Sequence, residues 1–182
     1  MSRPRRRQRV EPSPHPTSSA RPRQPRPTWH RTREVDNSVD LLLPDVKSAA
    51  RYAADHGGKV VVPPRLLAGR GEIALLADPE GAPFGVIHSS SGDPPDYLAE
   101  DKQWVWIELW AKDPKAMAGF YSGLAGYELE PVERPDGRMS YYLASGGYTH
   151  CGIIPSPAPS TAPAWLSYLR PMASGGGGGR RR

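Results

Sequence analysis

The feature that most constrains the fold of this 182-residue chain is an internal repeat with a period of 68 residues. The matched positions are Asp45 with Asp113, Tyr52 with Phe120, Gly58 with Gly126, Val61 with Leu129, Pro63 with Pro131, Ile73 with Tyr141 and Leu75 with Leu143. Polar, glycine and hydrophobic positions all keep the same register. A register that holds over such a distance indicates a duplicated structural unit.

Each copy opens with an apolar segment that ends at an aspartate, and a helical pattern follows. Asp45 and Asp113 lie where a carboxylate accepts hydrogen bonds from the free amides of a first helical turn. Pro114 lies at the first helical position, where its missing N–H costs nothing. Gly57 and Gly126 are expected to end the helices, because glycine tolerates the left-handed conformation. The predicted inner faces are Val46, Ala49, Ala50 and Ala53 in the first helix, and Ala116, Met117, Phe120, Tyr121 and Leu124 in the second.

Three strand-like segments follow each helix, separated by turns rich in proline and glycine. The predicted strands are Lys59–Val62, Glu72–Ala77 and Phe84–His88 in the first copy, and Glu128–Val132, Met139–Ala144 and Thr149–Ile154 in the second. Each copy is therefore a βαβββ unit, the first running from Val39 to Ser89 and the second from Trp104 to Pro155. The predicted fold class is α+β.

Two groups of residues carry a resemblance to a known family. The Asp113 cap, the helix with Phe120-Tyr121 and the following Gly126-Tyr127 are similar to the opening of a vicinal oxygen chelate module. The segment from Asp78-Pro79-Glu80-Gly81 to Gly85 is similar to the closing half of one. The chain thus resembles the glyoxalase/bleomycin resistance/dihydroxybiphenyl dioxygenase superfamily over about residues 37–170, most of all the tandem-domain bacterial proteins called 27 kDa antigen-like.

The resemblance and the composition together predict how the chain is divided. The expected divisions are a disordered Arg/Pro-rich tail at 1–36, a βαβββ module at 37–89, a linker at 90–103, a second module at 104–155, a linker with the first strand of an incomplete third module at 156–170, and a Gly/Arg tail at 171–182. Because a third module starts and then stops, one hypothesis is a truncated reading frame. The alternative is an intact protein with disordered ends.

Positive charge is concentrated at the two ends of the chain. Ten of the 24 Lys+Arg lie in residues 1–34 and three are Arg180 to Arg182, whereas 17 of the 19 acidic residues lie between these segments. The part that can fold is therefore acidic, although the whole chain carries +5. We expect no specific nucleic-acid partner, because such a surface repels phosphate.

The sequence also predicts the cellular compartment of the protein. No segment approaches the roughly 20 apolar residues of a membrane span, and no apolar segment follows the basic N-terminus as in a secretory signal. The single Cys151 is compatible with a reducing cytoplasm, and its apolar neighbours indicate an inert strand thiol. We therefore expect a cytoplasmic protein without a membrane partner.

The resemblance implies where a catalytic metal would bind. Metal enzymes of the family carry His or Gln on the first strand of a module and Glu on the last strand. This chain has Trp106 and Ser38 at the first-strand positions and Gly85 at the last-strand position. None of these is a useful ligand for a hard cation. We expect no cofactor, with a divalent metal as the disfavoured alternative.

Alternation along the first strand of the second copy predicts a ligand-binding surface. The odd positions Val105, Ile107 and Leu109 would pack under the helix, which leaves the other side for a flat or cationic ligand. The candidate binding residues are Trp104, Trp106, Glu108, Trp110, Asp40 and Tyr141. The alternative interpretation is structural: the tryptophans pack against the neighbouring module and Glu108 is a hydrogen-bonded rim residue.

Three functional hypotheses follow from these residues. The first is a metal-free protein of bleomycin-resistance type that binds a small aromatic or cationic molecule. The second is a lyase, dioxygenase or hydroxylase of the superfamily, whose metal site this chain would lack, so that catalysis stays uncertain and no catalytic residue is assigned. The third is an inactive truncated product. A homodimer is a further expectation, because an exposed aromatic face favours association.

Overall fold

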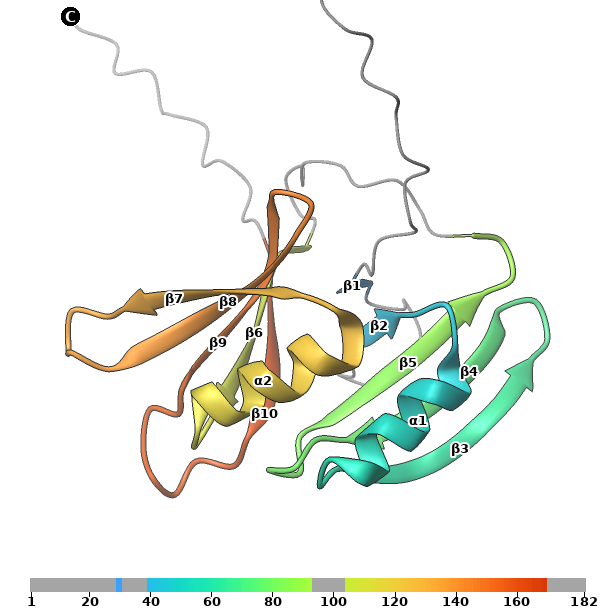
Figure 1. Ribbon diagram of the computed structural model, residues 1–182, viewed down its shortest axis with the longest axis horizontal. Coiled ribbons are helices and arrows are strands. Elements are labelled where there is room, and N and C mark those ends of the chain that lie inside the picture. The colour runs from blue at the N-terminus through green and yellow to red at the C-terminus, as the bar shows by residue number, and fades with distance from the viewer. Residues whose placement is uncertain (1–28, 31–38, 93–103, 170–182) are drawn as a thin grey trace, which may run out of the picture.

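The computed structural model describes residues 29–30, 39–92 and 104–169 of the chain (Figure 1). The elements are β1 (Trp29–His30), β2 (Asp40–Leu42), α1 (Val46–Asp55), β3 (Lys59–Leu67), β4 (Gly71–Ala77), β5 (Pro83–Ser89), β6 (Trp104–Ala111), α2 (Pro114–Ala125), β7 (Glu128–Glu133), β8 (Met139–Ser145), β9 (Tyr148–Pro155) and β10 (Ala164–Leu169). We call β2 to β5 the first module and β6 to β9 the second module.

Each module builds one sheet, and a strand from outside the module extends it. The first sheet has the order β1-β2-β5-β4-β3 and the second has the order β10-β6-β9-β8-β7. In both sheets the first strand of the module runs parallel to the last, β2 with β5 and β6 with β9, and every other pairing is antiparallel. The predicted α+β fold of two βαβββ modules is confirmed.

The helices begin and end where the sequence predicts. The Asp45 carboxylate accepts from the Ser48 amide at 2.9 Å, and the Asp113 carboxylate accepts from the Ala116 amide at 3.0 Å. Gly57 and Gly126 follow α1 and α2 with φ angles of 85° and 73°. These left-handed angles explain why both positions are glycine.

The inner face of α1 is the predicted one, and that of α2 differs at one position. All four predicted residues of α1 are buried. In α2, Met117, Phe120 and Tyr121 are buried, but Ala116 is exposed and Ala118 is fully buried instead. The prediction for Ala116 was wrong because this residue belongs to the capped first turn, whereas Ala118 lies one turn before the buried Tyr121.

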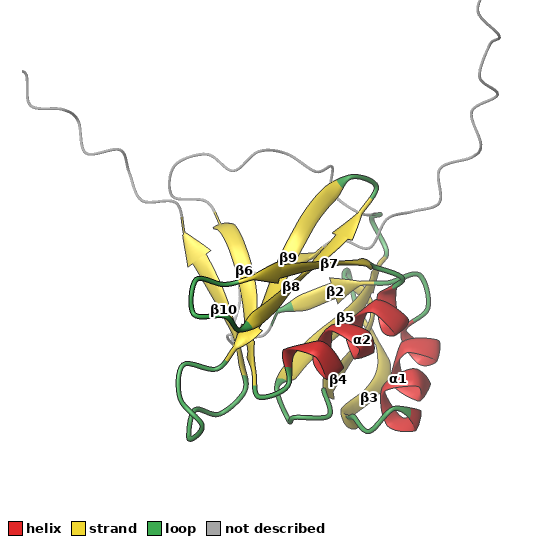
Figure 2. Cartoon of the chain, turned by 60° about the vertical axis from the view of Figure 1, so that its left-hand side comes forward, coloured by secondary structure: helices red, strands yellow, loops and turns green. Residues whose placement is uncertain are grey.

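One continuous core joins the two modules. α1 and α2 contact each other and lie on the same side of the molecule, each against its own sheet (Figure 2). Their buried residues belong to a single cluster together with strand residues such as Leu76, Phe84, Leu109 and Ile153. A Cβ at Gly123 would lie 2.0 Å from the Tyr52 hydroxyl, so the absence of a side chain there permits the close approach of the helices.

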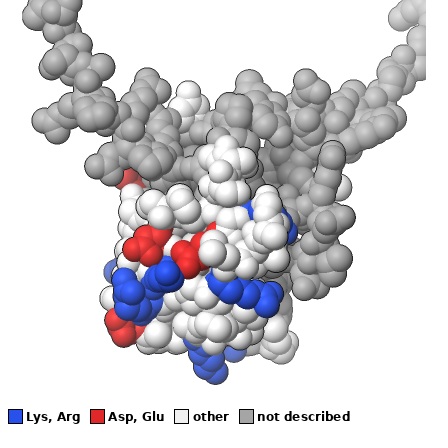
Figure 3. Space-filling view, turned by 90° about the vertical axis from the view of Figure 1, so that its right-hand side faces the viewer, with Lys and Arg blue, Asp and Glu red and all other residues white. Residues whose placement is uncertain are grey.

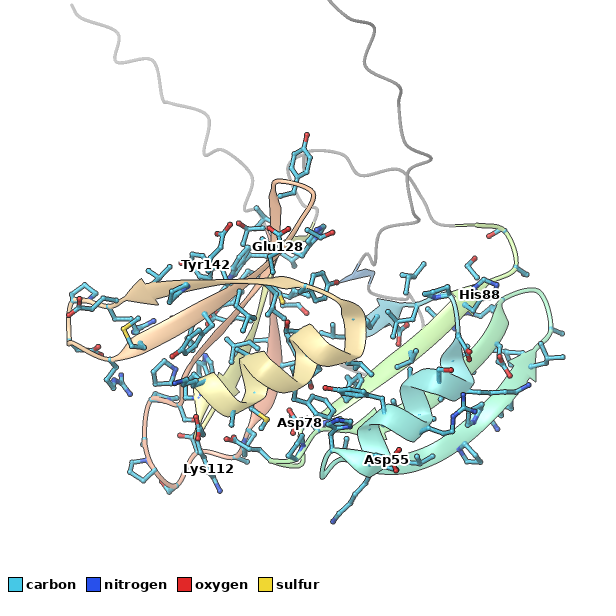
Figure 4. The ribbon with its side chains drawn as sticks, in the orientation of Figure 1. Asp55, Asp78, His88, Lys112, Glu128 and Tyr142 are labelled. Atoms are coloured by element: carbon cyan, nitrogen blue, oxygen red, sulfur yellow. The ribbon has the colours of Figure 1, made fainter. Side chains whose placement is uncertain are left out.

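Polar contacts also cross the junction between the modules. The Glu80 carboxylate, in the turn before β5, accepts from the backbone amides of Lys112 and Asp113 at 2.7 and 2.6 Å. Asp78 lies in the same turn, between the two helices (Figure 4), and is only 2% exposed. The Tyr121 hydroxyl donates to Asp78 at 3.1 Å and accepts from the Trp165 indole at 3.2 Å.

The strands are longer than predicted, and two of them extend the modules. β3 continues through Pro63-Pro64 to Leu67, with two irregularities in its register. It lies at the edge of the sheet, where a proline without an N–H is tolerated. β1 lies within the predicted tail and pairs with β2. The segment predicted to begin a third module forms a strand, β10, which pairs with β6.

The remaining predictions fall on other parts of the chain. The rest of the N-terminal tail, most of the linker at 90–103 and the C-terminal tail lie outside the described residues. Basic and acidic side chains are interspersed on the side of the molecule that carries α1 and β3 (Figure 3), where Lys47 and Glu72 form an ion pair at 3.4 Å. Neither helix in the described ranges has the length and hydrophobicity to cross a membrane.

Candidate functional site

The two sides of β6 have different environments, as alternation predicts, except at Val105, which is 45% exposed near the start of the strand instead of packing under the helix. Leu109 and Ala111 are fully buried in the core, and Ile107 packs against it. Trp106, Glu108 and Trp110 point to the opposite side of the sheet, away from α2, and each is half-buried. The chemistry-bearing residues of this strand therefore lie on the side that the helix does not cover.

Strands β8, β9 and β10 add to that side of the sheet. The rings of Trp106 and Tyr142 meet edge to face with centroids 5.7 Å apart. A Cβ at Gly152 would lie 3.2 Å from the Trp106 ring and 3.4 Å from the Tyr142 ring, so this glycine makes room for both. We call the side formed by Trp106, Glu108, Trp110, Tyr142, Gly152 and Tyr168 the aromatic face.

The only carboxylate among the six residues of the aromatic face is Glu108. Its Oε1 atom accepts from the Trp110 indole N–H at 3.1 Å and from the Tyr168 hydroxyl. The hydrogen bond to Glu108, together with desolvation, raises the pKa of Tyr168 to about 12, so this hydroxyl remains a donor at neutral pH. Both donors are neutral and both use Oε1. No donor within the described ranges bonds Oε2.

The structure brings together three of the six predicted binding residues. Trp106, Glu108 and Trp110 are neighbours on the aromatic face, whereas Tyr141 points to the other side of β8 and packs against the core. Trp104 begins β6, but its side chain lies outside the described part of the structure.

The sixth predicted residue, Asp40, belongs to the first sheet. It pairs with Gly85 in the parallel register of β2 and β5. In the second sheet Glu108 pairs with Gly152 in the same way. The repeat therefore places an acid beside a glycine in each module, although the two pairs lie on different sheets.

Sequence reasoning missed Tyr142, Gly152 and Tyr168 as parts of the face. For the adjacent pair Tyr141-Tyr142, alternation alone shows only that one of them faces each side. The buried Leu143 supplies the missing reference, since Tyr141 shares its side. Tyr168 reaches Glu108 because β10 pairs antiparallel with β6.

The described residues at the positions where metal enzymes of the superfamily carry ligands are Trp106 and Gly85. A Cβ at Gly85 would lie 1.9 Å from the Asp40 carboxylate oxygen, so a longer side chain there would displace Asp40. Trp106 contributes an indole ring packed on Tyr142. Across the described residues, no group of three or more His, Cys, Asp or Glu side chains could hold a metal ion.

Other candidates lie apart from the aromatic face. Cys151 is fully buried in the core, and this burial raises the pKa of its thiol well above the usual range. His150 lies with its ring centroid 5.6 Å from that of Tyr127, and His88 is exposed near the end of β5. Neither histidine is paired with a nucleophile or a carboxylate in the hydrogen bonds of the described residues.

Comparisons with known proteins agree with this architecture. No family model matches the chain. Two curated relatives named "Putative glyoxylase CFP32", from Mycobacterium bovis and Mycobacterium tuberculosis, are each 23% identical over 129 residues. The match covers 71% of this chain and 49% of each relative, so the chain spans about half the length of the curated relatives it matches.

A solved structure supports the same fold. The Mn(II)-bound glyoxalase from Novosphingobium aromaticivorans superimposes with a TM-score of 0.55 and 19% identity, covering 66% of this chain and 42% of that chain. The βαβββ modules and this likeness define the glyoxalase/dioxygenase fold. The chain has the fold of the vicinal oxygen chelate superfamily, as the Asp78–Gly85 segment and the capped helices predict.

Proposed function

We propose that this chain is a metal-free member of the superfamily that binds a small aromatic or cationic molecule on its aromatic face, without turnover. The observation that carries the proposal is the hydrogen bonding of the Glu108 carboxylate. Two neutral donors orient its carboxylate through Oε1, which leaves Oε2 to accept from a ligand. Indole and phenol rings lie on the same side of the sheet.

This arrangement suits a flat or positively charged ligand for physical reasons. Aromatic rings attract cations through their electron-rich faces, with about 0.5–2 kcal/mol for each contact. A half-buried carboxylate adds ionic attraction to a cation, and a charge-assisted hydrogen bond where the ligand carries an N–H donor. The fixed position of Glu108 reduces the entropy lost on binding, because the Trp110 and Tyr168 donors already restrict its rotamer.

The enzymatic alternative requires ligands at the positions now occupied by Trp106 and Gly85. No feature of the described residues favours it. The proposed partner is a small molecule. The proposed location is the cytoplasm, because the free, buried Cys151 is compatible with a reducing compartment.

The test is a ligand screen on the full chain, with intrinsic tryptophan fluorescence and thermal stability as readouts. We expect aromatic amines and quaternary ammonium compounds to raise the unfolding temperature, and Trp106→Leu to abolish the effect. Tyr148→Leu is the matched control, because Tyr148 is an aromatic residue outside the aromatic face and 65% exposed. A ligand that stabilises the wild type and Trp106→Leu equally contradicts the proposed site. Metal content after purification is the second readout, and one divalent ion per chain contradicts the metal-free proposal.

A further inference from the structure

Two acidic residues that the sequence analysis did not select lie beside the aromatic face. Glu130 on β7 pairs directly with Tyr142 on β8, and Glu128 pairs with Ala144. Directly paired residues project to the same side of a sheet. Glu128 and Tyr142 accordingly lie on the side away from α2 (Figure 4), and both glutamates are exposed.

The strand registers place these acids in a defined order across the sheet. Glu130 pairs with Tyr142, Tyr142 with Gly152, and Gly152 with Glu108. The backbones of Glu130 and Glu108 are therefore three strand spacings apart, about 14 Å at 4.7–4.9 Å each. Tyr142 and Gly152, which has no side chain, lie between these two glutamates across the sheet. The Trp106 ring lies against Tyr142 and Gly152.

A second observation on the same side is a buried polar group without a hydrogen-bond partner. Ser140 precedes Tyr142 by two positions on β8, so their side chains share one side of the sheet. Ser140 is only 2% exposed, and its hydroxyl has no hydrogen-bond partner in the described part of the chain. An unpaired buried hydroxyl costs free energy unless a partner reaches it.

Among the described residues of the second sheet, the arginines lie at the hairpin between β7 and β8. Arg134 and Arg138 occupy the β7–β8 hairpin, where Asp136 pairs with both at 3.9 and 2.9 Å. Arg134 is four residues from Glu130, which is about 13 Å along a strand and beyond a Debye length at physiological salt. Among the described residues, the aromatic face and its acidic border thus contain the carboxylates of Glu108, Glu128 and Glu130 and no Lys or Arg.

We infer that the aromatic face selects organic cations, with Glu128 and Glu130 as the residues that determine this selectivity. The ligand class is a planar aromatic cation, such as a quaternised nitrogen heterocycle, whose ring packs on Trp106 and Tyr142 beside Glu108. The inference rests on the proposed function and narrows it from aromatic or cationic ligands to positively charged aromatic ones.

The test compares three probes of one size on the full chain: N-methylquinolinium, quinoline and 1-naphthoate. At neutral pH these carry a positive charge, no charge and a negative charge. Isothermal titration at low and physiological salt gives a dissociation constant for each. We expect the cation to bind most tightly and its affinity to fall with added salt, because screening weakens attraction between partly exposed charges.

Two variants test whether the charges of Glu128 and Glu130, and not the shapes of their side chains, determine the affinity for the cation. Glu128→Gln and Glu130→Gln keep the side-chain volume, and each is expected to weaken N-methylquinolinium binding about threefold to fivefold, as expected for charges acting through solvent-exposed surroundings. Quinoline affinity stays unchanged. Glu133→Gln is the matched control, because Glu133 lies on the same strand but pairs with Met139 on the opposite side. This control is expected to leave the affinity for all three probes unchanged.

Each possible result of these titrations has a different consequence for the inference and for the proposed function. Binding of the cation that both variants weaken, with Glu133→Gln unchanged, supports the inference. Equal binding of all three probes, or cation binding that neither variant alters, overturns the charge selectivity and leaves the proposed function standing. No binding of any probe contradicts the proposed function itself.

Discussion

The Tyr121 hydroxyl donates a hydrogen bond of 3.1 Å to the buried Asp78 carboxylate, and this contact ties α2 of the second module to the β4–β5 turn of the first. The same hydroxyl accepts from the Trp165 indole on β10. Ala82 and Glu80 amides bond the other Asp78 oxygen. Three segments distant in sequence thus meet at one buried polar network, and we expect the two modules to unfold as a single cooperative unit.

Tyr121→Phe is expected to destabilise the whole described fold. The change removes the hydroxyl that donates to a buried carboxylate oxygen, at a cost of about 1–3 kcal/mol for an unsatisfied buried group. Urea unfolding followed by tryptophan fluorescence and by far-ultraviolet circular dichroism measures the effect. We expect both signals to shift together to a lower midpoint. Separate transitions for the two modules would contradict the single cooperative unit.

Asp78 makes the stability of the fold depend on pH. Burial raises the pKa of its carboxyl above 3.8, more than the hydrogen bonds from Ala82 and Tyr121 lower it. The folded state therefore holds this proton more tightly than the unfolded state. The resulting stabilisation is complete below the unfolded pKa and disappears as the pH rises through the folded pKa.

Asp78→Asn is the variant that tests this dependence. The free energy of unfolding of the wild type, relative to Asp78→Asn, is expected to decrease between pH 4 and pH 7. Chemical denaturation across this range gives both curves. A difference that rises with pH would mean that the pKa of Asp78 is lowered in the folded state.

Gly152→Val is expected to disturb the aromatic face and spare the fold. Its side chain would displace the Trp106 and Tyr142 rings, since even a Cβ lies 3.2 Å from one and 3.4 Å from the other. We expect a changed near-ultraviolet circular dichroism signal and at least a tenfold loss of probe affinity. Gly119→Ala is the control, because a Cβ there meets nothing within 4 Å. That change is expected to stabilise α2 by about 0.5–1 kcal/mol.

Ser140→Ala is expected to separate stability from binding. Removing a buried hydroxyl that lacks a partner is neutral or stabilising without ligand, since a desolvation cost disappears. If the ligand uses that hydroxyl, the variant binds a hydrogen-bonding ligand more weakly than the wild type does. A destabilised variant with unchanged binding would assign Ser140 a purely structural role. Thermal unfolding and titration of the same samples decide between these outcomes.

The sequence predicts the backbone of this protein better than it predicts the composition of the aromatic face. The helix caps at Asp45 and Asp113 depend only on neighbouring residues, and the 68-residue repeat indicates the positions that they occupy. The inner and outer sides of β6 follow from alternation, which is also local. Ala116 was misplaced because the periodicity does not indicate where the capped turn ends.

Long-range pairing explains what the sequence does not reveal. Tyr168 meets Glu108 only because β10 pairs with β6 across 60 positions of chain. Glu130 joins the face through the register of β7 and β8. Tyr121 and Asp78 meet through the packing of one module on the other. None of these contacts has a signature in a local segment of sequence.

The most direct test of ligand binding on the aromatic face is nuclear magnetic resonance of the indole N–H groups, each assigned through a single Trp→Phe variant. Trp106 and Trp110 belong to the aromatic face, whereas Trp165 lies 8% exposed on the core side of β10. Titration with N-methylquinolinium is expected to shift the Trp106 and Trp110 resonances and leave Trp165 in place. A shift confined to Trp165, or no shift of Trp106 and Trp110 at saturation, would contradict the account.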